Sequence, residues 1–349
     1  MFAAETYRYR RDRLRHLLES GLVLFPGHDQ SCVNYPETYY PFRQDSSFLY
    51  FFGLDRPGLI VLLDLDQGRE VLFGPEASPD DLVWSGPGPG LAELGELSGV
   101  QESRPVEGLA GCLDTALAQK RYIHYLPQYR PESVLKLAGL LGLDPGAVNQ
   151  RTSLLLIRAV VSLRSVKTDE EIAEIEAALE TTRDMQLLAM AMVRPGLREK
   201  EVAGAILGLA LAHGGPAFAP VVTTQGQFLH NPSYDNLMQE GQLLINDCGA
   251  ESKLHYAADI TRTIPVSGRF TGKQKDIYRI VLQGWEEATR AIRPGIRYLE
   301  VHLLAARGLA RGLRDLGLMR GDGDEAVAAG AHALFFPHGL GHMVGLDVH

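Results

Sequence analysis

Short apolar runs alternate with longer amphipathic stretches over about the first 160 residues of the chain. Wholly or mostly apolar runs of four or five residues, with Gly, Pro or Asp at or near an end, predict buried strands. Such runs lie at 22–25, 59–63, 70–73 and 122–125. Two further stretches, 9–19 and 131–141, have the spacing of helices. This alternation predicts a mixed α/β N-terminal domain.

The pattern changes after residue 164. Thr168 and Glu171 form a capping box in front of apolar positions 172, 175 and 179, which predicts an amphipathic helix. The helix is expected to run to Val193, because a Pro-Gly pair follows. A chain of 349 residues is long for one core. We therefore predict two domains, residues 1–164 and 165–349.

The second domain contains a short internal similarity. Segments 193–202 and 292–301 each carry Arg-Pro-Gly between two helical stretches. Two copies are compatible with chance and with duplication of an αβ half. If the duplication is real, it predicts two similar halves with a site between them.

Composition and charge limit the class of protein. Hydrophobic residues make up 45% and charged residues 22%, as in ordinary globular proteins. The net charge of −9 argues against nucleic acid as a partner. Five arginines crowd the N-terminus, and a solvated helix face is the simpler explanation for them. They are Arg8, Arg10, Arg11, Arg13 and Arg15.

Cysteine usage and apolar run lengths indicate a compartment. Cys32, Cys112 and Cys248 are few, odd in number and widely spaced, which suits a reducing cytosol. We see no secretory signal and no apolar run of membrane-spanning length. We therefore expect a cytoplasmic protein without a membrane partner.

Two carboxylates follow a predicted strand in the second domain. An apolar run at 243–245 leads to Asp247, and the segment after His255 is expected to return as an antiparallel strand over 256–264 that carries Asp259. Two carboxylates that close repel each other unless a cation lies between them. A divalent metal resolves that conflict. By pattern alone, a surface hairpin with two solvated aspartates is the commoner arrangement.

Three histidines lie in the glycine-rich segment His-Gly-Leu-Gly-His-Met-Val-Gly-Leu-Asp-Val-His. They are His338, His342 and His349. The glycines and Pro337 argue against a helix and favour a loop whose backbone can approach a ligand closely. Because buried imidazoles need partners and often bind metals, this pattern favours a functional site.

Two other residues near these segments are of types that can carry chemistry. His230 precedes a turn, and its position alone is typical of a surface histidine. Cys248 adjoins Asp247, but no basic residue lies beside it, so we predict an inert packed thiol and not a nucleophile.

Taken together and in this order, the segments at 40–53, 247–266 and 338–349 resemble the pita-bread metallopeptidases, and within them the Xaa-Pro peptidases, aminopeptidase P and prolidase. The resemblance covers nearly the whole chain. It implies an α/β N-terminal domain followed by an α+β pita-bread C-terminal domain. It also implies a metallo-aminopeptidase that hydrolyses the Xaa-Pro bond at the N-terminus of peptides, and a homodimer or homotetramer.

The resemblance also implies residue roles. Two divalent ions are expected, manganese first, with cobalt or zinc as alternatives. Asp247 would bind one ion with both oxygens, Asp259 would bridge the two, and His342 would bind the other. His230 and His349 would contact the proline-containing peptide and the developing oxyanion. His338 would assist proton movement.

The sequence departs from the family at its end. The family has two further glutamate ligands after the His-Gly-Leu-Gly-His block, whereas this sequence stops at His349. We therefore expect a pita-bread domain that is incomplete at its C-terminus, an empty or mononuclear site, and weak or no activity of the 349-residue chain. A fragment of a longer protein is the other interpretation, and an intact mass above 38.3 kDa would show it.

Three alternatives stay open. Creatinase shares the fold without metal, but it lacks the paired aspartates. A non-catalytic pita-bread binding module is the second, although the surviving ligands resemble those of active members. The third is prolidase, a dipeptidase that must read the substrate carboxylate. Arg43 is a candidate substrate contact for either peptidase, and the sequence does not decide between them.

Overall fold

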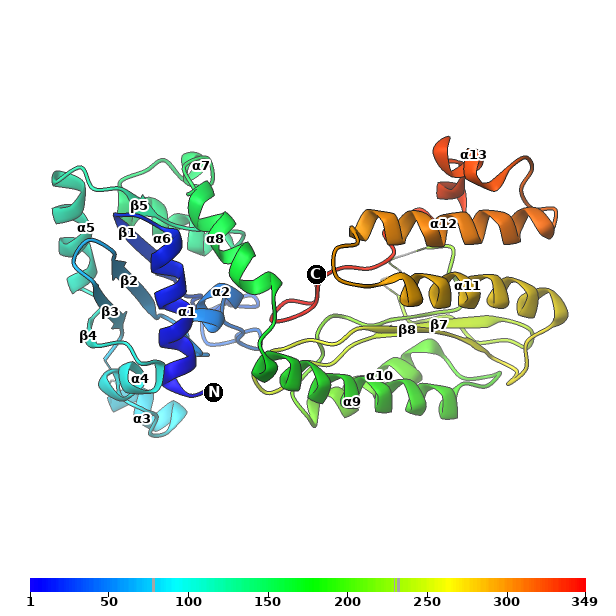
Figure 1. Cartoon of the computed structure of the whole chain (residues 1–349). Helices are drawn as coiled ribbons and strands as arrows, with labels where there is room; N and C mark the ends of the chain where they lie inside the picture. Colours follow the sequence, from blue (N-terminus) through cyan, green and yellow to red (C-terminus); the bar gives the residue numbers. More distant parts are fainter. Residues whose placement is uncertain (77–78, 229, 231–232) are drawn as a thin grey trace. The chain divides into compact units, whose positions relative to one another are not determined.

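The computed structural model describes residues 1–76, 79–228, 230 and 233–349 (Figure 1). The chain folds into two compact units, Met1–Glu174 and Ile175–His349. In the described residues no helix is both long and apolar enough to cross a membrane.

The first unit is built on a five-stranded mixed sheet. All four predicted strands are present, and the sheet order is β4-β3-β2-β1-β5. β1 pairs antiparallel with β2, and β2 with β3, whereas the outer strands β5 and β4 pair in parallel with β1 and β3. The bounds are β1 (Leu22–Pro26), β2 (Ile60–Asp64), β3 (Arg69–Gly74), β4 (Glu102–Pro105) and β5 (Ile123–His124).

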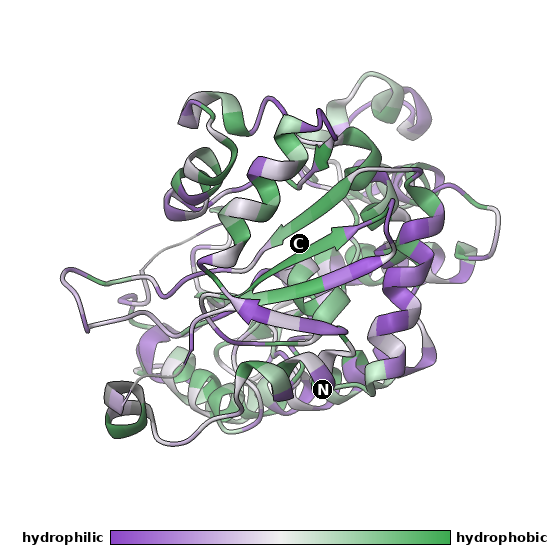
Figure 2. Ribbon diagram, turned by 90° about the vertical axis from the view of Figure 1, so that its left-hand side faces the viewer, coloured by the Kyte–Doolittle hydropathy of each residue, from purple (hydrophilic) through white to green (hydrophobic). Residues whose placement is uncertain are grey.

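Helices cover both faces of this sheet, which is why β1 is apolar and buried along its whole length (Figure 2). Leu22 and Leu24 belong to a core shared with α5 and α6. Phe25 faces the other way, with its ring centroid 5.1 Å from that of Phe51 in α2. The helices are α1 (Ala4–Leu17), α2 (Ser46–Phe52), α3 (Pro79–Ser85), α4 (Leu91–Ser98), α5 (Gly108–Ala118), α6 (Pro131–Leu141), α7 (Pro145–Val148) and α8 (Leu154–Ser165).

The N-terminal arginines do not all lie on a solvated face, so that expectation is wrong for two of them. Arg10 and Arg11 of α1 are 3% and 0% exposed. Arg11 pairs with Glu70 of β3 at 2.9 Å, and Arg10 lies 3.6 Å from Glu171. The sequence pattern missed this because a buried guanidinium depends on its partners, which here are 59 residues from Arg11 and 161 residues from Arg10 along the chain.

The second unit packs two helices against one face of a three-stranded antiparallel sheet, in the order β6-β7-β8. Met185, Val202 and Ile206 of the helices share a core with Leu244 of β7. The elements are α9 (Asp169–Met192), α10 (Glu199–Leu211), β6 (Val221–Thr223), β7 (Leu243–Cys248), β8 (Ile260–Pro265), α11 (Gly272–Ala291), α12 (Tyr298–Asp315), α13 (Gly323–Ala328) and a 3₁₀ turn η1 (Ala331–Leu334).

Local signals in this part of the sequence are confirmed. At the start of α9, Thr168 N donates to Glu171 Oε2 at 3.0 Å and Glu171 N donates to Thr168 Oγ1 at 3.4 Å, which is the predicted capping box. The two Arg-Pro-Gly segments form matching corners. Gly196 lies between α9 and α10, Gly295 lies between α11 and α12, and both have φ of +89°. A positive φ favours glycine, which explains its presence at both corners.

Candidate metal centre

Asp247 lies near the end of β7, on the face of the sheet that α9 and α10 do not cover. Burial alternates along this strand, with Leu244, Asn246 and Cys248 buried and the residues between them half-buried. Leu244 and Cys248 belong to the core with α9 and α10. Because side chains alternate between faces, Asp247 points to the opposite side.

The partner strand begins later than predicted. β8 starts at Ile260, so the expected strand over 256–264 is wrong in its first four residues. The residue opposite Asp247 is Thr261, whose hydroxyl donates to Asp247 Oδ1 at 2.8 Å. Asp259 lies two residues before Thr261 and therefore on the same face. The turn between the strands is longer than a tight hairpin, since Glu251 and Ala257 form an isolated bridge within it.

The histidine-rich segment is irregular, as its glycines predicted. Ala257 N donates to Gly345 O at 2.7 Å, which ties this segment to the turn before Asp259. A Cβ at Gly341 would lie 2.5 Å from the Tyr298 hydroxyl of α12. The glycine therefore permits the loop to approach α12 closely.

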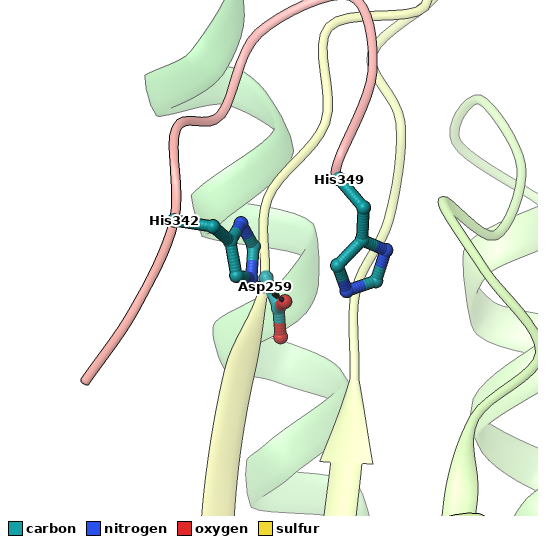
Figure 3. A group of neighbouring side chains, drawn as sticks. All are labelled: Asp259, His342 and His349. Atoms are coloured by element: carbon teal, nitrogen blue, oxygen red, sulfur yellow. Dashed lines mark ion pairs between the residues drawn. The ribbon is translucent and has the colours of Figure 1, made fainter. Parts of the chain in front are cut away.

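Three predicted residues converge on one point (Figure 3). One ligand atom each of Asp259, His342 and His349 lies within 4.8 Å of the others, and this is the only such group among the described residues. His342 Nε2 is 3.2 Å from Asp259 Oδ2. Two imidazoles and a carboxylate are the ligand types that hold divalent transition metals.

The electrostatics of this group favour a bound cation. Burial raises the pKa of Asp259, and the neighbouring Asp247 carboxylate raises it further, while His342 and His349 lower it. His342 Nδ1 lies 2.9 Å from the carbonyl oxygen of Met343, which can only accept, so Nδ1 carries the hydrogen. In the neutral ring the Nε2 lone pair then faces Asp259. A proton or a metal ion must lie between these two groups, and the residues therefore fit a metal site.

The remaining predicted residues occupy other positions. His349 lies against His342, with ring centroids 4.6 Å apart, and its ring makes a T-shaped contact with that of Phe218, with centroids 5.8 Å apart. His338 is exposed, lies outside the group of three, and has Nδ1 2.8 Å from Gly339 O. His230 is exposed too, and residues 229, 231 and 232 beside it lie outside the described residues.

Arg43 belongs to the first unit. Its Nη1 donates to Gln44 O at 3.0 Å and to Ser46 Oγ at 2.9 Å, which holds the side chain at the start of α2. Cys248 is fully buried, and burial raises the pKa of its thiol to about 12, so it is protonated at neutral pH as expected for an inert residue.

Thr261 is the site residue that the sequence argument missed. Asp259 lies just before β8 and Thr261 lies two residues later, so the spacing of two residues, which in extended backbone brings side chains to one face, was the available signal. Recognising Thr261 as the partner of Asp247 needed the register between β7 and β8, which the tertiary structure supplies.

Comparison with protein families gives the class. The profile of metallopeptidase family M24 matches residues 173–349, and that of the aminopeptidase P N-terminal domain matches residues 7–124. The chain therefore belongs to the pita-bread metallopeptidases of family M24. Within that family it groups with the aminopeptidases P, whose N-terminal domain it carries.

Individual relatives agree with this assignment. The chain is 32% identical over 357 residues to the Xaa-Pro aminopeptidase of Escherichia coli, covering 99% of this chain and 81% of the relative. It is 32% identical over 336 residues to a probable Xaa-Pro aminopeptidase of Chaetomium globosum, covering 95% of this chain but 55%, about half, of that relative.

Solved structures show the same fold. Two structures of Escherichia coli aminopeptidase P, a variant in complex with substrate and a zinc-substituted form in complex with product, match with TM-scores of 0.86 and 32% identity. Each alignment covers 100% of this chain and 82% of the solved chain. The predicted α/β domain followed by a pita-bread domain is confirmed.

Proposed function

We propose that this protein is a metal-dependent aminopeptidase that removes the N-terminal residue of peptides whose second residue is proline. The convergence of Asp259, His342 and His349 on one point, beside Asp247, carries the proposal. Further support comes from its relatives in Escherichia coli and Chaetomium globosum, which are an Xaa-Pro aminopeptidase and a probable one.

Asp247, Asp259 and His342 would hold the metal. When bound, a divalent cation polarises the scissile carbonyl and lowers the pKa of a bound water toward neutrality. The hydroxyl of Thr261 occupies one oxygen of Asp247 and so fixes the direction of that carboxylate. The carbonyl of Met343 fixes the tautomer of His342 and leaves Nε2 as the ligand atom.

The other histidines would act on the substrate. His349 lies beside the proposed ligands with its ring oriented by Phe218, a position from which it could donate to a developing oxyanion. We assign substrate contact to His230 as well, and proton movement to His338. We expect manganese as the ion, with cobalt or zinc as alternatives, and the zinc-substituted relative supports a divalent metal.

We also propose that a polypeptide of these 349 residues holds at most one ion firmly and hydrolyses peptides slowly. Two carboxylates and one imidazole leave a pair of dications short of negative charge and ligands. Metal content per chain after dialysis against manganese checks this. Two tightly held ions per chain would contradict it.

The experiment that tests the activity compares three peptides. With manganese present we expect release of glycine from Gly-Pro-Pro, less from Gly-Pro, and none from Gly-Ala-Ala. An Asp259→Asn variant should be inactive on all three, since it removes a ligand charge. Cleavage of Gly-Pro alone would favour the dipeptidase, for which Arg43 is the candidate carboxylate contact. Cleavage of Gly-Ala-Ala at an equal rate would contradict the proline requirement.

Assembly and location complete the proposal. We expect a homodimer or homotetramer in the cytoplasm. Light scattering of the purified protein measures the mass of the assembly, and cell fractionation tests the compartment.

A further inference from the structure

Gln186 of α9 lies directly behind the ends of the two strands that carry the aspartates. Its side chain is 4% exposed and comes from the helical side of the sheet, opposite to Asp247. It takes no part in the proposed chemistry. A buried amide is costly unless its hydrogen bonds are made, so the contacts of Gln186 are informative.

The amide group of Gln186 joins both strands at once. Nε2 donates to the backbone carbonyl of Asn246 at 3.1 Å and to that of Ile260 at 2.5 Å. Oε1 accepts from the side-chain amide of Asn246 at 2.9 Å. The two hydrogens of Nε2 match the two carbonyl oxygens, and its contact with Cys248 Sγ at 3.3 Å is the weaker one.

These two carbonyls flank the proposed metal ligands. Asn246 immediately precedes Asp247, and Ile260 immediately follows Asp259. A single side chain therefore fixes the peptide unit that joins Asn246 to Asp247 and the one that follows Ile260, one residue after Asp259, from the face that the carboxylates do not use. Two like charges repel and tend to separate unless their backbone is held. Hydrogen bonds from one side chain to both strands therefore limit how far the carboxylates of Asp247 and Asp259 can move apart.

We propose that Gln186 is a positioning residue that holds the ends of β7 and β8 at the separation at which Asp247 and Asp259 share a divalent cation. The inference rests on the proposed function, because it presumes that the carboxylates bind metal. Gln186 acts through the backbone and does not contact the ion.

Thr182 provides a matched control. It lies one turn before Gln186 on the same face of α9, is fully buried, and its hydroxyl accepts from Ala250 N at 3.0 Å. It thus anchors the same turn through a buried hydrogen bond to the backbone of Ala250, three residues beyond Asp247, and not through the carbonyls of Asn246 and Ile260 that Gln186 binds. Thr182→Val should lower stability without altering the spacing of the carboxylates.

The test is titration of the metal-free protein with Mn²⁺ by calorimetry, with unfolding by urea measured in parallel. Gln186→Met keeps the volume and removes the hydrogen bonds. We expect it to weaken Mn²⁺ binding by about 10–100-fold, the usual effect of losing an outer-shell partner. Thr182→Val should bind Mn²⁺ as the parent does. Amide exchange at 246–248 and 260–261 should be faster in Gln186→Met only.

Each other outcome counts against the inference. Unchanged Mn²⁺ affinity in Gln186→Met overturns it and leaves the proposed function standing. Equal weakening in Thr182→Val shows general destabilisation and also overturns it. A parent protein that binds no Mn²⁺ overturns the proposed function and this inference together. If Gln186→Met does not fold, Gln186→Asn, which is one methylene too short to reach both carbonyls, is measured under the same criteria.

Discussion

Replacing Arg11 by methionine should lower the unfolding free energy of the first unit far more than a substitution of an exposed residue on the same helix. The Arg11 guanidinium is fully buried and binds both oxygens of Glu70, at 3.0 and 3.1 Å from Nε. It also donates to three backbone carbonyls, those of Phe51, Ser98 and Gly99, at 2.8–3.0 Å. One side chain therefore connects α1 to α2, β3 and the end of α4.

The magnitude follows from what the substitution leaves behind. Methionine fills a similar volume, so the cavity is small, but among the described residues Glu70 keeps only Arg15 as an ion-pair partner, which lies 2.9 Å away and is partly exposed. Breaking a buried ion pair by removing one partner costs about 3–5 kcal/mol. The three carbonyls lose their charged donor as well, which places the expected loss at the upper end. A loss of about 3–5 kcal/mol lowers the melting temperature of a unit of this size by about 6–20 °C.

The assay must separate the two units, because a two-unit protein need not unfold in one step. Hydrogen exchange of peptides from residues 1–174, followed through a urea series, reports the first unit alone. Arg13→Met on the exposed face of α1 is the control and should change the unfolding free energy by less than about 0.5 kcal/mol. An Arg11→Met variant that matches this control would refute the reasoning. In the double variant Arg11→Met/Glu70→Met we expect partial recovery, since the carbonyls stay unpaired.

Three further predictions concern the site and pH. Without metal, Asp259→Asn should raise the thermal midpoint, because the raised pKa of Asp259 means that its negative charge is unfavourable in the folded protein. With metal at a hundredfold excess over Kd, the parent should gain about 2.7 kcal/mol of stability and the variant should not. Scanning calorimetry with and without Mn²⁺ measures both effects. Gly249→Ala should lower the unfolding free energy by about 1–3 kcal/mol and weaken metal binding, because the new Cβ would lie 1.9 Å from Ala258 O beside Asp259. Gly204→Ala, in the middle of α10 where a Cβ meets no other atom within 4 Å, is the control and should be neutral or stabilising. Urea titrations of the two variants measure the difference. Burial lowers the pKa of His124, so the unfolded chain takes up the proton at a higher pH than the folded chain. The contribution of neutral His124 to the stability of the first unit should therefore be complete above about pH 6.5 and be lost as the pH falls toward the folded-state pKa. A His124→Gln variant whose unfolding free energy changes with pH as steeply as that of the parent would contradict this.

Sequence reasoning was most successful where the signal was local. The capping box of Thr168 and Glu171, the Pro-Gly corners and the four apolar strands of the first unit all lie where the pattern placed them. These features depend on neighbours within a few residues along the chain, so the sequence carries them directly. Strand β4 was missed because its run Glu-Ser-Arg-Pro has no apolar periodicity, and its place at the sheet edge comes from pairing with β3.

The candidate site divides in the same way. Asp247, Asp259, His342 and His349 were identified from residue type and spacing, and the structure brings the last three together with Asp247 beside Asp259. His338, to which we assign proton movement and not metal binding, lies outside the group of three. A loop rich in glycine does not specify which of its side chains turn inward, because its backbone has many allowed conformations.

By itself, then, the sequence determined the family, the division into two domains, the charge and the candidate metal ligands, because these follow from residue types and short spacings. The tertiary structure alone decided which partners those side chains meet: Thr261 for Asp247, and Gln186 behind both strands. It also decided that Arg11 is buried. The physical reason is that burial, register and electrostatic neighbours arise from contacts between segments far apart in the chain, and a one-dimensional pattern does not contain their geometry.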